Sequence, residues 1–144
     1  MQDSAGIFRV AVSAIILNEK DEILITQRSF KRDHHPGEWE TVSGRLNQGE
    51  DFIDALHREI KEELNIVVKP IAPISTFHFY RGGDKIEHVG VNYLCRYESG
   101  NVTVDGIEEV DYKWVSLDSA LEIIKDESIR ASINQAVIFL QKWK

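Results

Sequence analysis

The chain has 144 residues and a formal net charge of −7, and 42% of its residues are hydrophobic and 28% charged. These values suit one folded globular domain over 1–144 and exclude a disordered chain. The negative charge disfavours non-specific binding to nucleic acid or to an anionic membrane, because both need a basic surface. No secretory signal and no apolar run of membrane-spanning length are found in the sequence. We therefore expect a cytoplasmic monomer or homodimer.

The first part of the chain predicts strands and a loop. Apolar, β-rich runs over 8–17 and 23–28 are separated by a polar turn, which is the pattern of a β-hairpin. The mostly polar segment 29–38 predicts a loop that can contact a substrate. A short strand over 40–42 leads to Gly44, whose backbone can approach a metal ion or a phosphate closely because it has no side chain.

One predicted helix carries a crowded row of carboxylates. Asp51 is suited to cap its first turn, and Asn65 to end it in the left-handed conformation. An apolar stripe marks its buried face: Ile53, Leu56, Ile60 and Leu64. Glu59, Glu62 and Glu63 share a neighbouring face at i, i+3 and i+4, where each like-charge pair costs about 0.2–0.5 kcal/mol. The helix alone is equally compatible with a solvated acidic surface, but a divalent cation would turn this repulsion into coordination.

The rest of the chain predicts further strands. A strand over 66–68 is followed by Pro70 and Pro73, which we expect to interrupt any helix or central strand and to leave a connecting segment. Two longer strands, 74–81 and 85–97, form a second predicted hairpin. The lone Cys95 falls in the second of these strands, where we expect a buried residue rather than a nucleophile.

The last part of the chain predicts the end of the sheet and two helices. A short strand over 102–104 and an acidic loop over 107–111 precede a strand over 112–115. Ser116 can cap a helix that runs to Ile124. A final helix has an apolar stripe for packing against a sheet: Ile129, Ile133, Ala136, Val137 and Leu140. The order of elements predicts an α/β fold.

The spacing around the acidic helix resembles the signature of the Nudix (MutT-like) hydrolases. Gly44 is followed after five residues by Glu50 and after seven more by the run 58–66. One position departs, since Asn65 stands where the family usually has Gly, a conservative change if the residue only ends the helix. The resemblance implies an α/β/α sandwich with a mixed β-sheet. It also implies hydrolysis of a phosphoanhydride in a nucleoside triphosphate or another nucleoside diphosphate derivative, with release of a nucleoside monophosphate.

The resemblance also implies roles for individual residues. Mg²⁺, with Mn²⁺ as a substitute, would be bound by the Gly44 carbonyl, Glu59, Glu62 and Glu63. Arg58 would hold a signature glutamate such as Glu59 in its catalytic position, with Glu50 as its own partner. Glu62 is the favoured base, and Glu108 and Glu109 are alternatives because some family members use a downstream loop.

The substrate pocket is less well defined by the sequence. Candidate contacts for a base or for phosphates are aromatic, basic or acidic: Arg28, Trp39, Phe79, Tyr80, Arg81 and Glu109, with Phe77, Lys31 and Arg32 as further possibilities. Aromatic strand residues more often belong to a core, and a single basic residue is more often an ordinary surface charge. The chain is too short for the additional domain that larger substrates often accompany, so we expect a small nucleotide.

Two alternatives remain open. The segments 27–31 and 36–39 resemble the isopentenyl diphosphate isomerase branch of the same superfamily. That branch needs a catalytic cysteine just before the signature, where this chain has Thr41, Val42 and Ser43. The other alternative is a non-catalytic, nucleotide-binding Nudix domain, although such domains typically lose signature carboxylates that this chain retains.

Overall fold

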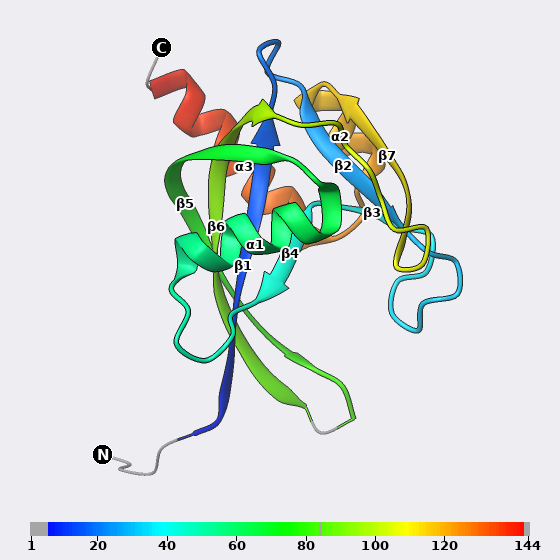
Figure 1. Ribbon diagram of the computed structural model, residues 1–144, viewed down its shortest axis with the longest axis vertical. Helices are drawn as coiled ribbons and strands as arrows, with labels where there is room; N and C mark the ends of the chain where they lie inside the picture. Colours follow the sequence, from blue (N-terminus) through cyan, green and yellow to red (C-terminus); the bar gives the residue numbers. More distant parts are fainter. Residues whose placement is uncertain (1–5, 84, 143–144) are drawn as a thin grey trace.

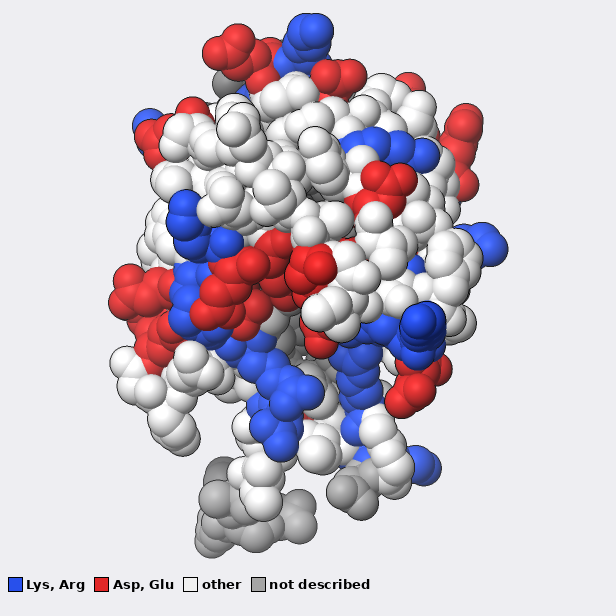
Figure 2. Space-filling view, turned by 45° about the vertical axis from the view of Figure 1, so that its right-hand side comes forward, with Lys and Arg blue, Asp and Glu red and all other residues white. Residues whose placement is uncertain are grey.

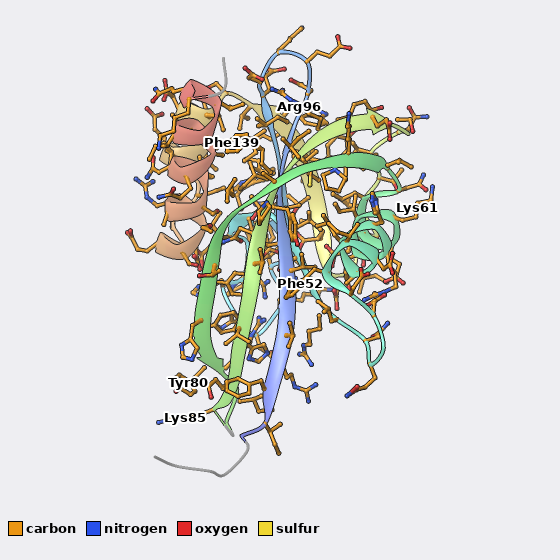
Figure 3. The ribbon with its side chains drawn as sticks, turned by 90° about the vertical axis from the view of Figure 1, so that its left-hand side faces the viewer. Phe52, Lys61, Tyr80, Lys85, Arg96 and Phe139 are labelled. Atoms are coloured by element: carbon orange, nitrogen blue, oxygen red, sulfur yellow. The ribbon has the colours of Figure 1, made fainter. Side chains whose placement is uncertain are left out.

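The computed structural model describes residues 6–83 and 85–142, and these residues form three layers (Figure 1). The strands of one mixed sheet are β1 (Phe8–Leu17), β2 (Ile23–Arg28), β3 (Trp39–Glu40), β4 (Val42–Arg45), β5 (Val67–Arg81), β6 (Ile86–Ser99) and β7 (Glu109–Val115). Helix α1 (Phe52–Leu64) covers one face, and α2 (Leu117–Ile123) and α3 (Glu127–Lys142) cover the other. Figure 3 shows the sheet between α1 and α3. The expected α/β/α sandwich is confirmed.

Strand β1 organises the sheet. It pairs in parallel with β6 along its whole length, from Phe8 opposite Glu87 to Leu17 opposite Arg96. Its other edge is shared, because β4 pairs with residues 11–14 and β2 joins only at Leu17. The two strands that share this edge, β2 and β4, each contribute residues to the pocket described below.

The two helical layers bury two separate cores, and β1 contributes to both. Neighbouring strand residues point to opposite faces of a sheet. The core under α1 includes Val12, Ala14 and Ile16 of β1 with Leu56, Ile60 and Leu64 of the helix. The core under α2 and α3 includes Ile15 and Leu17 of β1 with Ile133 and Ala136 of α3. Burial on both faces explains why the sequence of β1 is a continuous apolar run.

The predicted ends of α1 are confirmed. The Asp51 carboxylate accepts a hydrogen bond from the backbone N–H of Asp54 at 2.9 Å. Asn65 ends the helix with φ of 59°. The predicted stripe is wrong at one position, because Ile53 lies in the exposed first turn with 39% of its surface accessible, while Ala55 is buried.

The prediction for the two prolines is wrong. Strand β5 continues through Pro70 and Pro73 without a connecting segment. It is an edge strand that pairs only with β6, and its register shifts between Pro70 and Ala72 and between Pro73 and Ser75. An edge strand tolerates proline because the missing N–H can face away from the ladder, and bulges absorb the local misfit.

Two predictions near the acidic loop also need correction. Residues 102–104 form no strand, and instead the Thr103 N–H donates to the Leu64 carbonyl at 3.0 Å. Strand β7 begins at Glu109 rather than at residue 112, because the Asp105 carboxylate accepts backbone N–H bonds that fold 105–109 into a tight turn. None of the described helices is both long and apolar enough to cross a membrane.

Candidate active site

A pocket of about 660 Å³ lies beside the carboxylate row of α1. Its walls come from α1, from β3 and β4, from the hairpin of β5 and β6, and from the loops before β3 and β7. Acidic and basic side chains lie next to each other around a hollow on this side of the molecule (Figure 2). The pocket therefore combines both charge signs at one site.

The signature helix contributes two of its three glutamates to the pocket lining. Glu59 and Glu63 line it, whereas Glu62 lies outside the lining with 59% of its side chain accessible. Glu59 lies directly against the backbone of Gly44, because a Cβ atom at that glycine would sit 2.0 Å from the carboxyl carbon of Glu59. Gly44 is thus needed for the close approach of helix and strand β4.

Arg58 is anchored by Glu50. Its Nε donates to Oε2 of Glu50 at 2.7 Å, and its Nη2 donates to Oε1 at 2.8 Å. The backbone N–H of Asn47 donates to the same carboxylate at 2.9 Å. These hydrogen bonds, those from Arg58 first, lower the pKa of Glu50 to about 2. A bidentate pair of this kind fixes the guanidinium in one orientation.

The anchored Arg58 in turn holds the carboxylates of its own helix. Nη1 donates to Oε1 of Glu59 at 2.8 Å and to Oε2 of Glu62 at 3.3 Å. Nη2 donates to the backbone carbonyl of Arg45 at 2.9 Å, which ties α1 to β4 beside Gly44. Arg58 therefore positions Glu59 and fixes the helix to the strand.

Carboxylates from other elements join the two helix glutamates. Glu40 on β3 and the exposed Glu108 line the pocket, together with Glu109, which is buried at the start of β7. Arg32 reaches Oε1 of Glu109 at 3.4 Å, but no hydrogen-bond donor of the described residues reaches the buried Oε2, and, in addition to burial, a proton shared with the Glu40 carboxyl helps to raise the pKa of Glu109. An unpaired buried carboxylate oxygen is costly and calls for a partner.

The pKa values of two carboxylates in this acidic cluster agree with their burial and crowding. Burial, followed by the charges of Glu59, Glu40 and Glu108, raises the pKa of Glu63 to about 8. Burial, together with Glu40 and Glu63, likewise raises the pKa of Glu109. Like-charged carboxylates in a poorly hydrated pocket hold protons unless a cation is present.

Basic residues form the part of the lining next to the acidic cluster. Arg28 is buried, donates from Nε to the His34 carbonyl at 2.8 Å and pairs with Glu40 at 3.1 Å. Among residues 6–83 and 85–142, Arg45 and Arg81 have no carboxylate partner. Burial, followed by Arg28 and other arginines, lowers the pKa of Arg81. These two cations are available to an anionic ligand.

The aromatic candidates have different surroundings. Phe79 stacks on His88 with ring centroids 4.7 Å apart and on Phe77 at 5.9 Å. Tyr80 also lines the pocket but is largely exposed near the tip of the hairpin (Figure 3). Trp39 lines the pocket and also packs on the core under α2 and α3.

Sequence reasoning missed several residues of the lining. The additional polar residues include Ser13, Glu40, Arg45, His88 and Asn92. Arg45 follows Gly44 directly, so its position beside the signature was a usable signal. The others reach the pocket through strand pairing, above all the parallel contact of β1 with β6. Lys31, a sequence candidate, is exposed and does not line the pocket.

The described residues contain no three acidic, histidine or cysteine side chains already arranged around one ion position. The donor set still fits a hard divalent cation, because Glu59 and Glu63 bring two carboxylates to the pocket next to the backbone of Gly44. A cation would relieve the repulsion that raises the pKa of Glu63. Mg²⁺ keeps part of its water shell and needs few protein ligands, so a looser arrangement suits it.

Comparison with known proteins identifies the family of this chain. The family model described as NUDIX domain matches residues 7–136. The chain is 32% identical to the isopentenyl-diphosphate Delta-isomerase of Klebsiella pneumoniae (strain 342) over 120 residues, which are 80% of this chain and 65% of the isomerase. It is 39% identical to the 8-oxo-dGDP phosphatase of Mus musculus over 89 residues, which are 62% of this chain and 25% of the phosphatase. The chain therefore spans less than two thirds of the length of these relatives.

A solved structure supports the same conclusion about the fold. The crystal structure of the MutT protein from Methanosarcina mazei Go1 superposes with a TM-score of 0.75. The alignment covers 95% of this chain and 96% of that chain at 23% sequence identity. At this identity the similarity concerns the fold, and the chemistry must be argued from the pocket.

Proposed function

Because the chain belongs to the NUDIX domain family, we propose that it is a metal-dependent hydrolase of a phosphoanhydride bond in a nucleoside triphosphate or another nucleoside diphosphate derivative. The single observation that carries this proposal is the pocket with two kinds of charge. Glu59, Glu63 and Glu109 crowd together on one side, and the unpaired Arg45 and Arg81 belong to the same lining. A substrate with several phosphates can bridge a cation on the acidic side and the two arginines.

The metal would be Mg²⁺ or Mn²⁺, held by Glu59 and Glu63 with the Gly44 carbonyl and the more exposed Glu62. When bound, it would neutralise phosphate charge and make a water molecule more acidic. Arg58 keeps Glu59 in place through the 2.8 Å hydrogen bond, so this one ligand is positioned before the metal arrives.

A carboxylate must accept the proton of the attacking water. Sequence reasoning favours Glu62, but that side chain lies outside the pocket lining. Glu109 lines the pocket, and no hydrogen-bond donor of the described residues reaches its Oε2. We therefore propose Glu109 as the proton acceptor and Glu62 as a metal ligand. A Glu109→Gln variant should then lose kcat while it still binds Mn²⁺, and Glu62→Gln should weaken Mn²⁺ binding.

The arginines would bind the phosphates away from the metal. Arg81 lies at the end of β5, is partly buried in the pocket lining, and has no carboxylate partner among the described residues. A guanidinium of this kind can bind a phosphate through charge-assisted hydrogen bonds. Arg45 follows Gly44 and places a second guanidinium next to the metal ligands.

The isomerase reading is a second candidate, because the curated isomerase is 32% identical over most of this chain. The pocket does not favour it. Cys95 lies in the core under α1, is fully buried, and burial raises the pKa of its thiol to about 12. The pocket lining contains no cysteine among the described residues. A thiol nucleophile or acid is therefore not available at this site.

The test is a substrate panel with Mg²⁺, followed by chromatography of the products. It contains nucleoside triphosphates, oxidised nucleotides, nucleotide sugars, ADP-ribose, dinucleoside polyphosphates and isopentenyl diphosphate. We expect a nucleoside monophosphate from at least one nucleotide, and loss of turnover in EDTA. If isopentenyl diphosphate is the only compound converted, the isomerase is supported. If no compound is converted but the protein still binds a nucleotide, a non-catalytic binding domain is supported.

A further inference from the structure

The wall of the pocket on β6 contains a polar atom that nothing in the described chain satisfies. His88 is 4% exposed, and its Nε2 is buried without a hydrogen-bond partner in the described residues. The other ring nitrogen, Nδ1, lies 3.0 Å from the backbone carbonyl of Ile86. A carbonyl only accepts, so Nδ1 carries the proton, and in the neutral ring Nε2 presents a lone pair.

The neighbours of His88 make this part of the pocket a place for a flat ring. Phe79 stacks on the imidazole with ring planes 10° apart, and Phe77 stacks on Phe79. Phe77 can lie close to the sheet because Gly90 has no side chain, since a Cβ there would be 2.2 Å from the Phe77 ring. With 38% of its surface accessible, Phe79 is the most exposed part of this aromatic group.

The floor next to these rings is polar as well. Asn92 accepts from the Ser13 hydroxyl and donates to the Ser75 hydroxyl at 2.9 Å, so a hydrogen-bonded row crosses three strands. The amide of Asn92 is thereby held in one orientation. In contrast with this satisfied row, His88 keeps one free acceptor beside the rings.

We propose that His88 is a specificity-determining residue, whose Nε2 accepts a hydrogen bond from an N–H group on the edge of a substrate base that packs at Phe79. The ligand class is a nucleobase with an amino or ring N–H donor. Because Nε2 is buried in this structure, the half-exposed Phe79 ring beside it must shift enough for the edge of the base to reach Nε2. An isoprenoid chain has no such donor and would leave the acceptor unpaired. This inference rests on the proposed function and adds to it the group that recognises the base.

The test measures binding of products, so that it needs neither metal nor turnover. Dissociation constants are measured for nucleoside monophosphates and for matched analogues that lack the amino group or carry a methyl group on the ring nitrogen. For at least one base, the wild type should bind the donor-bearing member about three- to tenfold more tightly, the range of a single hydrogen bond. His88→Phe keeps a ring for Phe79 and should bind both members of the pair equally.

Two further variants separate this role from a structural one. His88→Gln restores a side-chain acceptor and should recover part of the discrimination. Tyr97→Phe removes one polar group from an aromatic ring on the same strand, outside this pocket, and should discriminate as the wild type does. Equal binding of both members by the wild type, or unchanged discrimination in His88→Phe, would overturn the proposal. If discrimination depends on His88 but no nucleotide is hydrolysed, the inference stands and the proposed reaction fails.

Discussion

The acidic wall and the strand wall of the pocket differ in how the chain builds them. In the acidic wall, Glu59 and Glu63 lie one turn apart on α1, with Glu62 beside them outside the lining, so short-range sequence spacing places them together. The strand wall needs β1, β5 and β6, whose residues are distant in sequence and meet through parallel and antiparallel pairing. The carboxylates proposed to bind the metal are therefore placed by local sequence spacing, while the proposed surface for the rest of the substrate depends on strand topology.

The largest effect on activity is expected from removing the Glu63 carboxylate of the acidic wall. Glu63→Gln removes a proposed ligand charge and should lower kcat by about two orders of magnitude or more. At neutral pH the metal-free variant should be more stable than the metal-free wild type, because folding no longer has to keep a buried carboxyl protonated above its ordinary pKa. Turnover with Mg²⁺ and thermal unfolding in EDTA measure the two effects. Glu122→Gln on α2 is the exposed control, and near-normal kcat in Glu63→Gln would refute the assigned role.

The second prediction concerns Arg58, which holds Glu59 of the acidic wall in position. Arg58→Ala should reduce kcat/KM about 10- to 100-fold, because Glu59 loses the contact that positions it. Arg58→Lys should recover little of this loss, since an ammonium cannot reproduce the fork to Glu50. Lys61→Ala, on the exposed side of the same helix (Figure 3), should behave as the wild type. Equal activity of the Arg58 and Lys61 variants would contradict the positioning role.

The third prediction moves to the basic residues of the pocket. Arg81→Gln should raise KM about tenfold with little change in kcat, because the proposed phosphate contact exists in both the ground state and the transition state. Lys85→Gln removes a charge from the same hairpin, outside the pocket lining (Figure 3), and should leave KM unchanged. Steady-state kinetics with the best substrate of the panel measure KM and kcat for both variants. A selective loss of kcat would instead place Arg81 at the reacting phosphate.

The smallest effect concerns stability and pH without metal. The pKa of Glu63 is about 8 in the folded protein, above its ordinary value of 4.5. Between these values the folded protein keeps a proton that the unfolded chain has released, so stability should fall as pH rises through this window, and Glu109, whose pKa is also raised, adds to the same decline. Urea unfolding of the EDTA-treated protein checks this, and Glu63→Gln should flatten the decline. A wild-type stability that rises across the window would contradict the assigned environment.

The difference between local spacing and strand topology also explains which parts of the structure were predictable from sequence. The caps at Asp51 and Asn65 and the carboxylate row follow from local spacing, and the structure has the caps as expected. Strand β5 was not predictable, because the penalty of Pro70 and Pro73 depends on whether a strand lies at an edge. Local periodicity does not report strand order.

The pocket shows the same limit at the level of single residues. The β-strand pattern of β6 does not reveal that His88 and Asn92 face Phe79 and Ser13. Likewise, no local signal distinguishes the buried Glu109 from the exposed Glu108 beside it, because the difference arises from the turn held by Asp105. Tertiary pairing decides which of these polar residues belong to the site.

Binding of Mn²⁺ to the metal-free protein tests whether the acidic wall is the metal site. Electron paramagnetic resonance measures free Mn²⁺ during a titration of the wild type and of a variant with both Glu59→Gln and Glu63→Gln. We expect the wild type to remove Mn²⁺ from solution and the double variant, with its fold intact, to do so far more weakly. The substrate nucleotide should tighten Mn²⁺ binding only in the wild type. Equal Mn²⁺ binding by the two proteins would contradict the claim that the acidic wall is the metal site.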